Sequence, residues 1–219
     1  MTPGSRALGV AVSASDGDDG PAHATVAGAV VRADRVVDGL SFSTCSVGGT
    51  DATAAMIDCW ERLAREDVRH LLVAGVAPAW FNVVDLAAVH EATDRPVVAV
   101  AFEASDGLEP HLRAHFDGAA LDARLATYRS LPDRHPVVLN PDDGEGEAGD
   151  DGGAEPDLCV RAVGVDDAEA RRVVRAHTPE GRRRPEPLRV AKLAARAGRS
   201  YLHDPGPPAS DPAGDAGDG

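Results

Sequence analysis

Two segments of the sequence place polar side chains directly after an apolar run, where a protein could carry out chemistry. They are VGGTDAT at residues 47–53 and VAGVAPAWFNVVD at residues 73–85. Open α/β sheets bind ligands in the crevice outside the carboxyl ends of their strands. Because each segment follows an apolar run that could be such a strand, both are candidate functional sites.

The first segment combines two glycines with three side chains that carry oxygen. Gly48 and Gly49 permit backbone conformations and close approaches that other residues do not. Thr50, Asp51 and Thr53 bring oxygens to the beginning of an amphipathic helix, where polar ligands can bind. The same pattern fits a turn followed by an Asp51 N-cap, which stabilises a helix by about 1 kcal/mol. The spacing alone favours the cap.

The second segment holds a large share of the aromatic area in a chain that is only 4% aromatic. Trp80 and Phe81 could stack on a base or sugar while the polar groups of Asn82 and Asp85 bond to its edge. Alternatively, the two rings seal the core over the following helix. The scarcity of aromatic residues favours this second interpretation, because a core must use some of them.

Motifs with a known catalytic mechanism are missing from the sequence. It contains no P-loop, no G-x-G-x-x-G after the first apolar run, no G-x-S-x-G and no H-E-x-x-H. Cys45, Cys59 and Cys159 are odd in number and far apart, which predicts reduced, buried thiols rather than disulfides or a zinc site. The basic run RRR at residues 182–184 is more typical of a solvated approach to a helix than of a phosphate contact.

The charge of the chain is strongly negative along its whole length. It has 36 acidic and 22 basic residues, a net charge of -14, and Lys192 as its one lysine. Dispersed carboxylates are typical of a protein from a high-salt cytosol, and we take this as a hypothesis. Equal stability of the fold in molar potassium chloride and in dilute buffer would contradict it. High salt weakens diffuse phosphate contacts, but it leaves base stacking and bound metal as routes to nucleic acid.

Apolar runs and turn residues predict an α/β domain. Three β-rich runs separated by Gly/Asp turns predict an antiparallel meander, and two later apolar runs predict buried parallel strands, giving a mixed sheet. The predicted strands are 7–14, 24–32, 35–43, 68–76, 95–103, 135–140 and 157–164. The predicted helices lie within 44–63 and at 81–92, 108–115, 118–131, 166–176 and from Pro185 or Pro187 onward.

Helical spacing predicts which side chains of two helices face the core. The predicted core positions are Met56, Cys59, Trp60 and Leu63 in the earlier helix, and Leu188, Ala191, Leu193 and Ala195 in the final one.

The predicted domain covers residues 1–203. Residues 140–157 are almost devoid of apolar side chains and predict an acidic disordered insertion, and residues 204–219 predict a disordered acidic tail. The beginning of the sequence lacks the pattern of a signal peptide, and no run approaches the roughly 18 apolar residues of a membrane span. We therefore expect a cytoplasmic protein that has no membrane partner.

Five segments resemble the archaeal endonuclease-V-like family, also called the endonuclease dU family: RALGVAVS, VGGTDAT, LLVAGVAPAWFNVVDLAAVHEATDRPVVAV, HTPEG and PEPLRVAKLAARA. The resemblance covers roughly residues 6 to 202. It implies a ribonuclease-H-like fold and carboxylates that hold Mg²⁺ or Mn²⁺ for cutting nucleic acid, DNA more than RNA, near deaminated bases.

The resemblance also implies roles for individual residues. Asp51 and Asp85 would be the catalytic carboxylates and the metal ligands, Trp80 would stack on a base and Asn82 would contact the substrate. The other implied substrate-binding residues are Gly48, Gly49, Thr50, Thr53 and Phe81.

The chain departs from the family pattern at three positions where a carboxylate is expected: Ala11, Gly48 and Ala74. Two divalent ions about 4 Å apart need several carboxylates, and Asp51 with Asp85 would hold at most one weakly bound ion. Activity then requires other acids to enter the site, and the candidates are Asp16, Asp18, Asp19 and Glu103. The alternatives are a non-catalytic protein that binds nucleic acid or nucleotides, or a small-molecule enzyme with a nucleotide pocket around Trp80.

Overall fold

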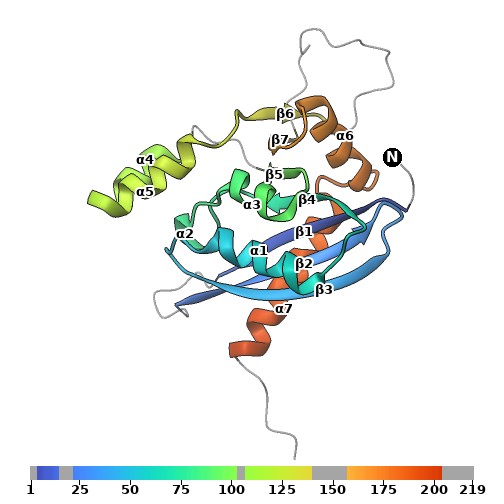
Figure 1. Cartoon of the computed structure of the whole chain (residues 1–219), viewed down its shortest axis with the longest axis horizontal. Coiled ribbons are helices and arrows are strands. Elements are labelled where there is room, and N and C mark those ends of the chain that lie inside the picture. The colour runs from blue at the N-terminus through green and yellow to red at the C-terminus, as the bar shows by residue number, and fades with distance from the viewer. Residues whose placement is uncertain (1–3, 15–21, 103–106, 140–156, 204–219) are drawn as a thin grey trace, which may run out of the picture.

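A computed structural model describes residues 4–14, 22–102, 107–139 and 157–203 of the chain. Its described residues include a seven-stranded sheet of order β3-β2-β1-β4-β5-β7-β6 (Figure 1). The strands are β1 (Arg6–Ser13), β2 (His23–Arg32), β3 (Val37–Ser46), β4 (Val68–Ala74), β5 (Val97–Ala101), β6 (His135–Val137) and β7 (Leu158–Val163). Two predicted segments and four candidate acids lie wholly or mostly outside the described residues: most of the insertion, the whole tail, and Asp16, Asp18, Asp19 and Glu103.

The pairing of the strands confirms the predicted mixed sheet. β1, β2 and β3 pair antiparallel as a meander, whereas β1 pairs parallel with β4 and β4 pairs parallel with β5. β7 lies antiparallel to both β5 and β6. Because β1, β4 and β5 run the same way, their carboxyl ends meet at one edge of the sheet.

Helices cover both faces of the sheet (Figure 1). Alternate strand residues point to opposite faces. Leu8 and Val10 pack with α1 (Ala52–Leu63) and α3 (Leu86–Thr93), whereas Ala7 and Ala11 face α6 (Asp167–His177) and α7 (Glu186–His203). A helical pair, α4 (Glu109–His115) and α5 (Gly118–Arg129), packs beside the segment after β4.

Two predictions about helices are wrong in detail. The helix predicted at 81–92 begins only at Leu86, because residues 79–81 have left-handed backbone conformations. In α7, Leu188, Ala191 and Ala195 are buried as predicted, but Leu193 is 54% exposed. Leu193 follows Ala191 by two residues, about 200° around a helix with 3.6 residues per turn, and so points away from the sheet.

The predicted core face of α1 is largely confirmed. Met56 and Cys59 are buried, and Trp60 and Leu63 are partly buried against the same cluster. Cys45 is also buried, and desolvation raises the pKa of both buried thiols to about 11. All three cysteines are free, but Cys159 is only half-buried, so the prediction of buried thiols is wrong for that residue.

α7 packs directly on the backbone of β1. A Cβ atom on Gly9 would lie 2.2 Å from the carbonyl carbon of Pro187 and 2.7 Å from the backbone nitrogen of Leu188. One turn later, Lys192 Nζ donates a hydrogen bond to the Val12 carbonyl oxygen at 2.6 Å. The missing side chain at position 9 therefore sets how closely the helix approaches the strand.

His177 at the end of α6 makes folding sensitive to acid. Its side chain is 3% exposed, and among the described residues neither ring nitrogen has a hydrogen-bond partner. Burial, with a smaller effect from the nearby His70, lowers its pKa from 6.5 to about 4. The imidazole is therefore neutral in the folded protein at pH 7.

We expect the contribution of His177 to lower the free energy of unfolding by about 3 kcal/mol between pH 6.5 and pH 4, at about 1.36 kcal/mol per pKa unit. Over this range the unfolded chain binds a proton at His177 that the folded chain excludes, and below the folded pKa the effect levels off. Urea unfolding of wild type and His177→Leu at several pH values measures it. The variant should have a shallower slope than wild type, while His111→Gln, at an exposed histidine, should keep the wild-type slope. Equal slopes in wild type and His177→Leu would contradict the assignment.

Among the described residues, no helix is both long and apolar enough to cross a membrane.

Candidate functional site

The two segments singled out in the sequence lie against each other in the structure. Residues 47–51 follow β3, residues 75–85 follow β4, and the Gly48 backbone N–H donates to the Ala79 carbonyl at 2.8 Å. Gly48 has a φ of +69°, and a Cβ there would lie 3.0 Å from Cε3 of Trp80. The glycine therefore supplies both a left-handed turn and a close approach to the indole ring.

Asp51 precedes α1, but its side chain does not cap the helix. The carboxylate accepts hydrogen bonds from the Ser46 backbone N–H at 3.0 Å, from Ser46 Oγ at 2.9 Å and from Asn82 Nδ2 at 2.7 Å. Desolvation alone would raise the pKa of Asp51, but the hydrogen bonds from Asn82 and Ser46 outweigh it and lower the pKa below its usual value. The carboxylate is therefore ionised at neutral pH, and the cap interpretation is wrong for its side chain.

Asn82 takes over the capping role from a distant part of the chain. Its Oδ1 accepts from the Ala52 backbone N–H at 2.9 Å, in the first turn of α1. Its Nδ2 donates to the Ser46 carbonyl at 2.9 Å as well as to Asp51. The residue is fully buried, so in this structure it joins β3, α1 and the segment after β4. Its contact with a substrate stays a prediction.

Asp85 is the N-cap of α3. Its Oδ1 accepts from the backbone N–H groups of Ala87 and Ala88, both at 3.0 Å. Its own backbone N–H donates to Thr53 Oγ1 at 3.0 Å, which connects the start of α3 to α1. Thr53 and Asp85 therefore fix the two helix starts relative to each other, while Thr50 lies exposed between Gly49 and Asp51.

Trp80 lies on a backbone that is rarely adopted by residues other than glycine. Ala79, Trp80 and Phe81 have φ values of 46°, 57° and 62° within the short left-handed turn Pro78–Phe81, labelled α2 in Figure 1. Each such residue costs roughly 1–2 kcal/mol, so surrounding contacts must hold the turn. The Trp80 side chain is 53% exposed and does not seal the core. Phe81 is half-buried and packs beside Val83, Leu112 and Leu125.

An aromatic cluster surrounds Trp80, and sequence reasoning missed part of it. The Trp80 ring centroid lies 5.7 Å from that of Phe81, 5.4 Å from that of His115 and 5.5 Å from that of Phe116. His115 approaches the indole edge-on, with an interplanar angle of 85°. His111 stacks on Phe81 one helical turn earlier. His111 and His115 are four residues apart in one helix, and this i,i+4 spacing was the one signal in the sequence that could have placed the two histidines together.

Arg124 in α5 is a second residue that the sequence did not reveal. It is 6% exposed, and burial lowers its pKa. Its guanidinium lies 3.9 Å above the Phe116 ring. It donates hydrogen bonds to the carbonyl oxygens of Gly48, Gly49, Phe81 and Ala120. The buried guanidinium thereby ties α5 to the glycine pair and to the left-handed turn.

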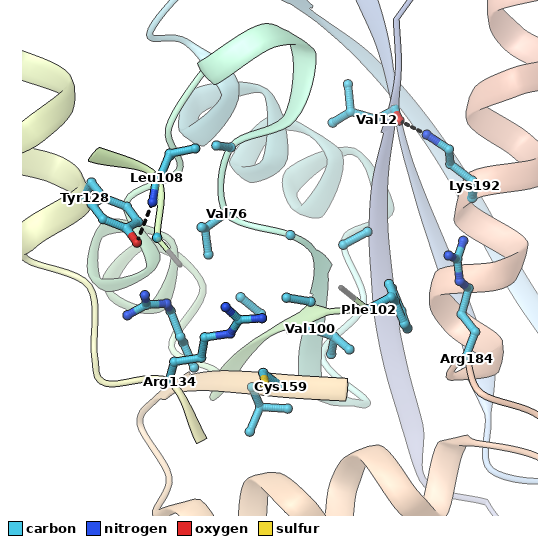
Figure 2. A pocket seen from close by; sticks show the side chains of 18 residues that line it. Val12, Val76, Val100, Phe102, Leu108, Tyr128, Arg134, Cys159, Arg184 and Lys192 are labelled. Carbon is cyan, nitrogen blue, oxygen red and sulfur yellow. Dashed lines mark hydrogen bonds between the residues drawn. The ribbon is translucent and has the colours of Figure 1, made fainter. Parts of the chain in front are cut away.

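A pocket of about 410 Å³ lies at the carboxyl ends of β1, β4 and β5 (Figure 2). Val12, Ala74 and Val100 line it from the strand ends. Four cationic side chains also line it: Arg134, Arg161, Arg184 and Lys192. The basic run at 182–184 therefore places one of its three arginines in a pocket.

The described residues do not fit a divalent metal site. They contain no group of three or more His, Cys, Asp or Glu side chains that could hold an ion. The carboxylates of Asp51 and Asp85 accept hydrogen bonds from protein N–H groups instead. Ala11 and Ala74 follow the paired Val10 and Val73 and pack against the same cluster, where neither offers a ligand.

Comparison with known proteins places the chain in a family. The model of the family described as Endonuclease dU matches residues 3–198. The chain belongs to the endonuclease dU family. A UPF0215 protein of Pyrobaculum aerophilum is 31% identical over 181 residues, which cover 82% of this chain and 88% of that protein. A UPF0215 protein of Thermococcus kodakarensis is 35% identical over 173 residues, covering 78% of each.

Solved structures share the fold of this endonuclease dU family member. A protein of unknown function from Archaeoglobus fulgidus has a TM-score of 0.69 and 25% identity, with 88% of this chain and 97% of that chain covered. Endonuclease V from Bacillus subtilis has a TM-score of 0.57 and 15% identity, with 90% of this chain and 82% of that chain covered. Endonuclease V from Ciona intestinalis, in complex with a DNA containing an inosine, has a TM-score of 0.56 and 12% identity, with 91% of this chain and 87% of that chain covered. The predicted ribonuclease-H-like fold is confirmed, and family and fold together support a nuclease-like function.

Proposed function

We propose that the protein acts on nucleic acid, DNA more than RNA, and cleaves it near a deaminated base that stacks on Trp80. Membership of the endonuclease dU family supports a nuclease-like activity. The Ciona endonuclease V that shares the fold was solved with a DNA containing an inosine, which supports DNA with a deaminated base as the substrate class. The exposed indole of Trp80, at a junction predicted from the sequence, is the observation that carries the proposal.

The geometry around Trp80 suits a flat ligand. Trp80 is more than half exposed, its ring lies close to Gly48, and the His115 ring packs nearly perpendicular to it. Stacking of a base on an aromatic side chain contributes about 1–3 kcal/mol and depends little on sequence. In a chain of net charge -14, stacking also avoids reliance on diffuse positive charge, which salt screens. Base stacking is therefore the part of nucleic-acid binding that this chain can best support in high salt.

We expect Trp80→Ala to weaken binding of an oligonucleotide that carries one hypoxanthine or uracil by roughly 5- to 150-fold, the equivalent of 1–3 kcal/mol. Fluorescence anisotropy in the presence of a chelator measures binding apart from any metal-dependent step. Tyr201→Ala removes another exposed aromatic side chain, far along the sequence on α7, and should leave the affinity unchanged. Equal affinities of wild type and Trp80→Ala would remove Trp80 from the proposal.

The proposal extends to Mg²⁺ or Mn²⁺ as the cofactor of cleavage. The described carboxylates do not fit such an ion, so the cofactor is tested by measuring the cleavage rate in the presence of a chelator, of Mg²⁺ and of Mn²⁺. If no cleavage above the chelated control is found at any salt concentration, binding that persists in chelator would support the non-catalytic alternative.

A further inference from the structure

The pocket at the carboxyl ends of β1, β4 and β5 gathers positive charge in a strongly negative protein. Its cationic side chains come from four places in the chain: Arg134 precedes β6, Arg161 lies on β7, Arg184 precedes α7 and Lys192 lies on α7. Lys192 is the one lysine of the whole sequence. Among the described residues that line the pocket there is no carboxylate. The charge of the described lining is thus opposite to that of the protein as a whole.

The cations lie on opposite sides of the pocket and are held by neighbouring groups. Figure 2 shows Arg134 on one side and Arg184 with Lys192 on the other. The Arg184 guanidinium lies 4.2 Å from the centroid of the Phe102 ring, and Lys192 is fixed by its bond to the Val12 carbonyl. Arg161 donates to the Pro132 carbonyl. A guanidinium carries five N–H donors, so this bond leaves Arg161 with donors for a ligand.

We infer that this pocket binds a phosphate monoester directly through its cationic side chains, without a divalent ion. Guanidinium groups match the geometry of phosphate oxygens and form charge-assisted hydrogen bonds with them. A phosphate monoester carries a charge between -1.5 and -2 at pH 7, whereas a phosphodiester carries -1. Several cations that line one pocket therefore favour the monoester.

The size and lining of the pocket favour a monoester that carries an organic group. Its volume of about 410 Å³ falls within the range of roughly 300–1,000 Å³ that is typical of small-molecule sites. This volume exceeds the space that a phosphate alone fills. Apolar side chains such as Val76, Val100 and Phe102 line the remaining surface. A nucleoside 5′-monophosphate has the required chemistry, with a dianionic end and a base whose flat faces can lie against apolar side chains.

The absence of metal ligands in the described lining is consistent with direct binding. The fold family implies a carboxylate-bound ion at these strand ends, yet β4 presents Ala74 there and α7 presents Lys192. An ammonium group beside a divalent ion would repel it. The cationic side chains neutralise the phosphate themselves, so binding has no need of an ion. This site stands independently of base stacking at Trp80.

The half-buried Cys159 lines the same pocket and offers a chemical readout of its occupancy. Cys45 and Cys59 are buried, so an alkylating reagent should modify Cys159 first. A ligand in the pocket should then slow this modification.

The test measures binding of deoxyuridine 5′-monophosphate by calorimetry in a chelating buffer, with Cys159 alkylation as the second readout. We expect binding to wild type, protection of Cys159, and at least tenfold weaker binding by Arg184→Gln and by Lys192→Gln. Arg182→Gln changes a neighbouring arginine of the same run that does not line the pocket, and it should bind like wild type. Thermal unfolding of each variant separates loss of the ligand site from loss of the fold.

Three outcomes would overturn the inference. The first is equal affinity in wild type and Arg184→Gln, and the second is binding that disappears in chelator and returns with Mg²⁺. The third is equally tight binding of a dinucleotide that has one internal phosphodiester and no terminal phosphate. Inorganic phosphate as a further probe shows the contribution of the anion alone, and its binding with the same dependence on Arg184 would support the site. Because Trp80 does not line this pocket, protection of Cys159 by the mononucleotide should persist in Trp80→Ala, so failure here is distinguishable from failure of the proposed function.

Discussion

Replacing Gly9 with alanine is expected to lower the free energy of unfolding by about 3 kcal/mol, the upper part of the range for overpacked cores. The added methyl group would lie 2.2 Å from the Pro187 carbonyl carbon and 2.3 Å from its oxygen. Both atoms belong to the backbone at the start of α7, so no side-chain rotation can relieve the overlap. The helix must move away from β1, which separates Leu188 and Ala191 from the core they share with the sheet.

Urea unfolding of Gly9→Ala and Gly4→Ala measures this effect with a matched control. A Cβ on Gly4 would meet no atom within 4 Å, so that variant should change stability by less than about 0.5 kcal/mol. If Gly9→Ala were as stable as Gly4→Ala, the close packing of α7 on β1 would be refuted. Because α7 also carries Lys192, the same variant should weaken binding in the cationic pocket.

Asp51→Ala is expected to reduce nicking of DNA containing uracil or hypoxanthine at least tenfold. The carboxylate accepts hydrogen bonds from Ser46 and Asn82, and its loss leaves the Ser46 backbone N–H and one N–H of the buried Asn82 amide without an acceptor. Leaving a buried donor unsatisfied costs about 1–3 kcal/mol. The segment 47–51, on which the Trp80 ring rests, then loses one of its links to the residues after β4 and keeps those through Gly48 and Arg124.

The measurement is single-turnover cleavage in Mg²⁺ or Mn²⁺ and molar potassium chloride. Asp58→Ala removes another acid of the same region, a partly exposed partner of Arg62 in α1, and should cleave like wild type. A cleavage rate of Asp51→Ala within twofold of wild type would exclude a role for this carboxylate. Parallel anisotropy measurements show whether the loss lies in binding or in the later step.

The sequence was sufficient for the sheet and for the location of the two polar segments. Alternating and continuous apolar runs depend on local chemistry, so β1, β2, β4 and β5 could be predicted from them. The role of Asp51 could not, because its partner Asn82 lies 31 residues further along the chain and supplies the cap in its place. Local patterns describe what a residue can bond to nearby, and the tertiary fold decides which bond forms.

The same limit explains what sequence reasoning missed around Trp80 and in the cationic pocket. Arg124 is a good helix former in a helix with little amphipathic pattern, and nothing local indicates that its guanidinium is buried against four carbonyl groups. The residues of the cationic pocket are separated by up to 58 positions, from Arg134 to Lys192, and only the folded sheet brings them together. The left-handed turn at 79–81 contains no glycine and so gave no signal of its conformation.

That left-handed turn has a consequence for how tightly a ligand can bind. Contacts from Gly48, Arg124 and the aromatic cluster hold the backbone of residues 79–81, and with it the orientation of the indole, in the folded protein. A flexible exposed tryptophan would lose rotational freedom when a base stacked on it, and this loss would subtract from the affinity. Here the restriction is imposed during folding, so a base that stacked on Trp80 as proposed would meet a preorganised surface and keep more of the stacking energy as affinity.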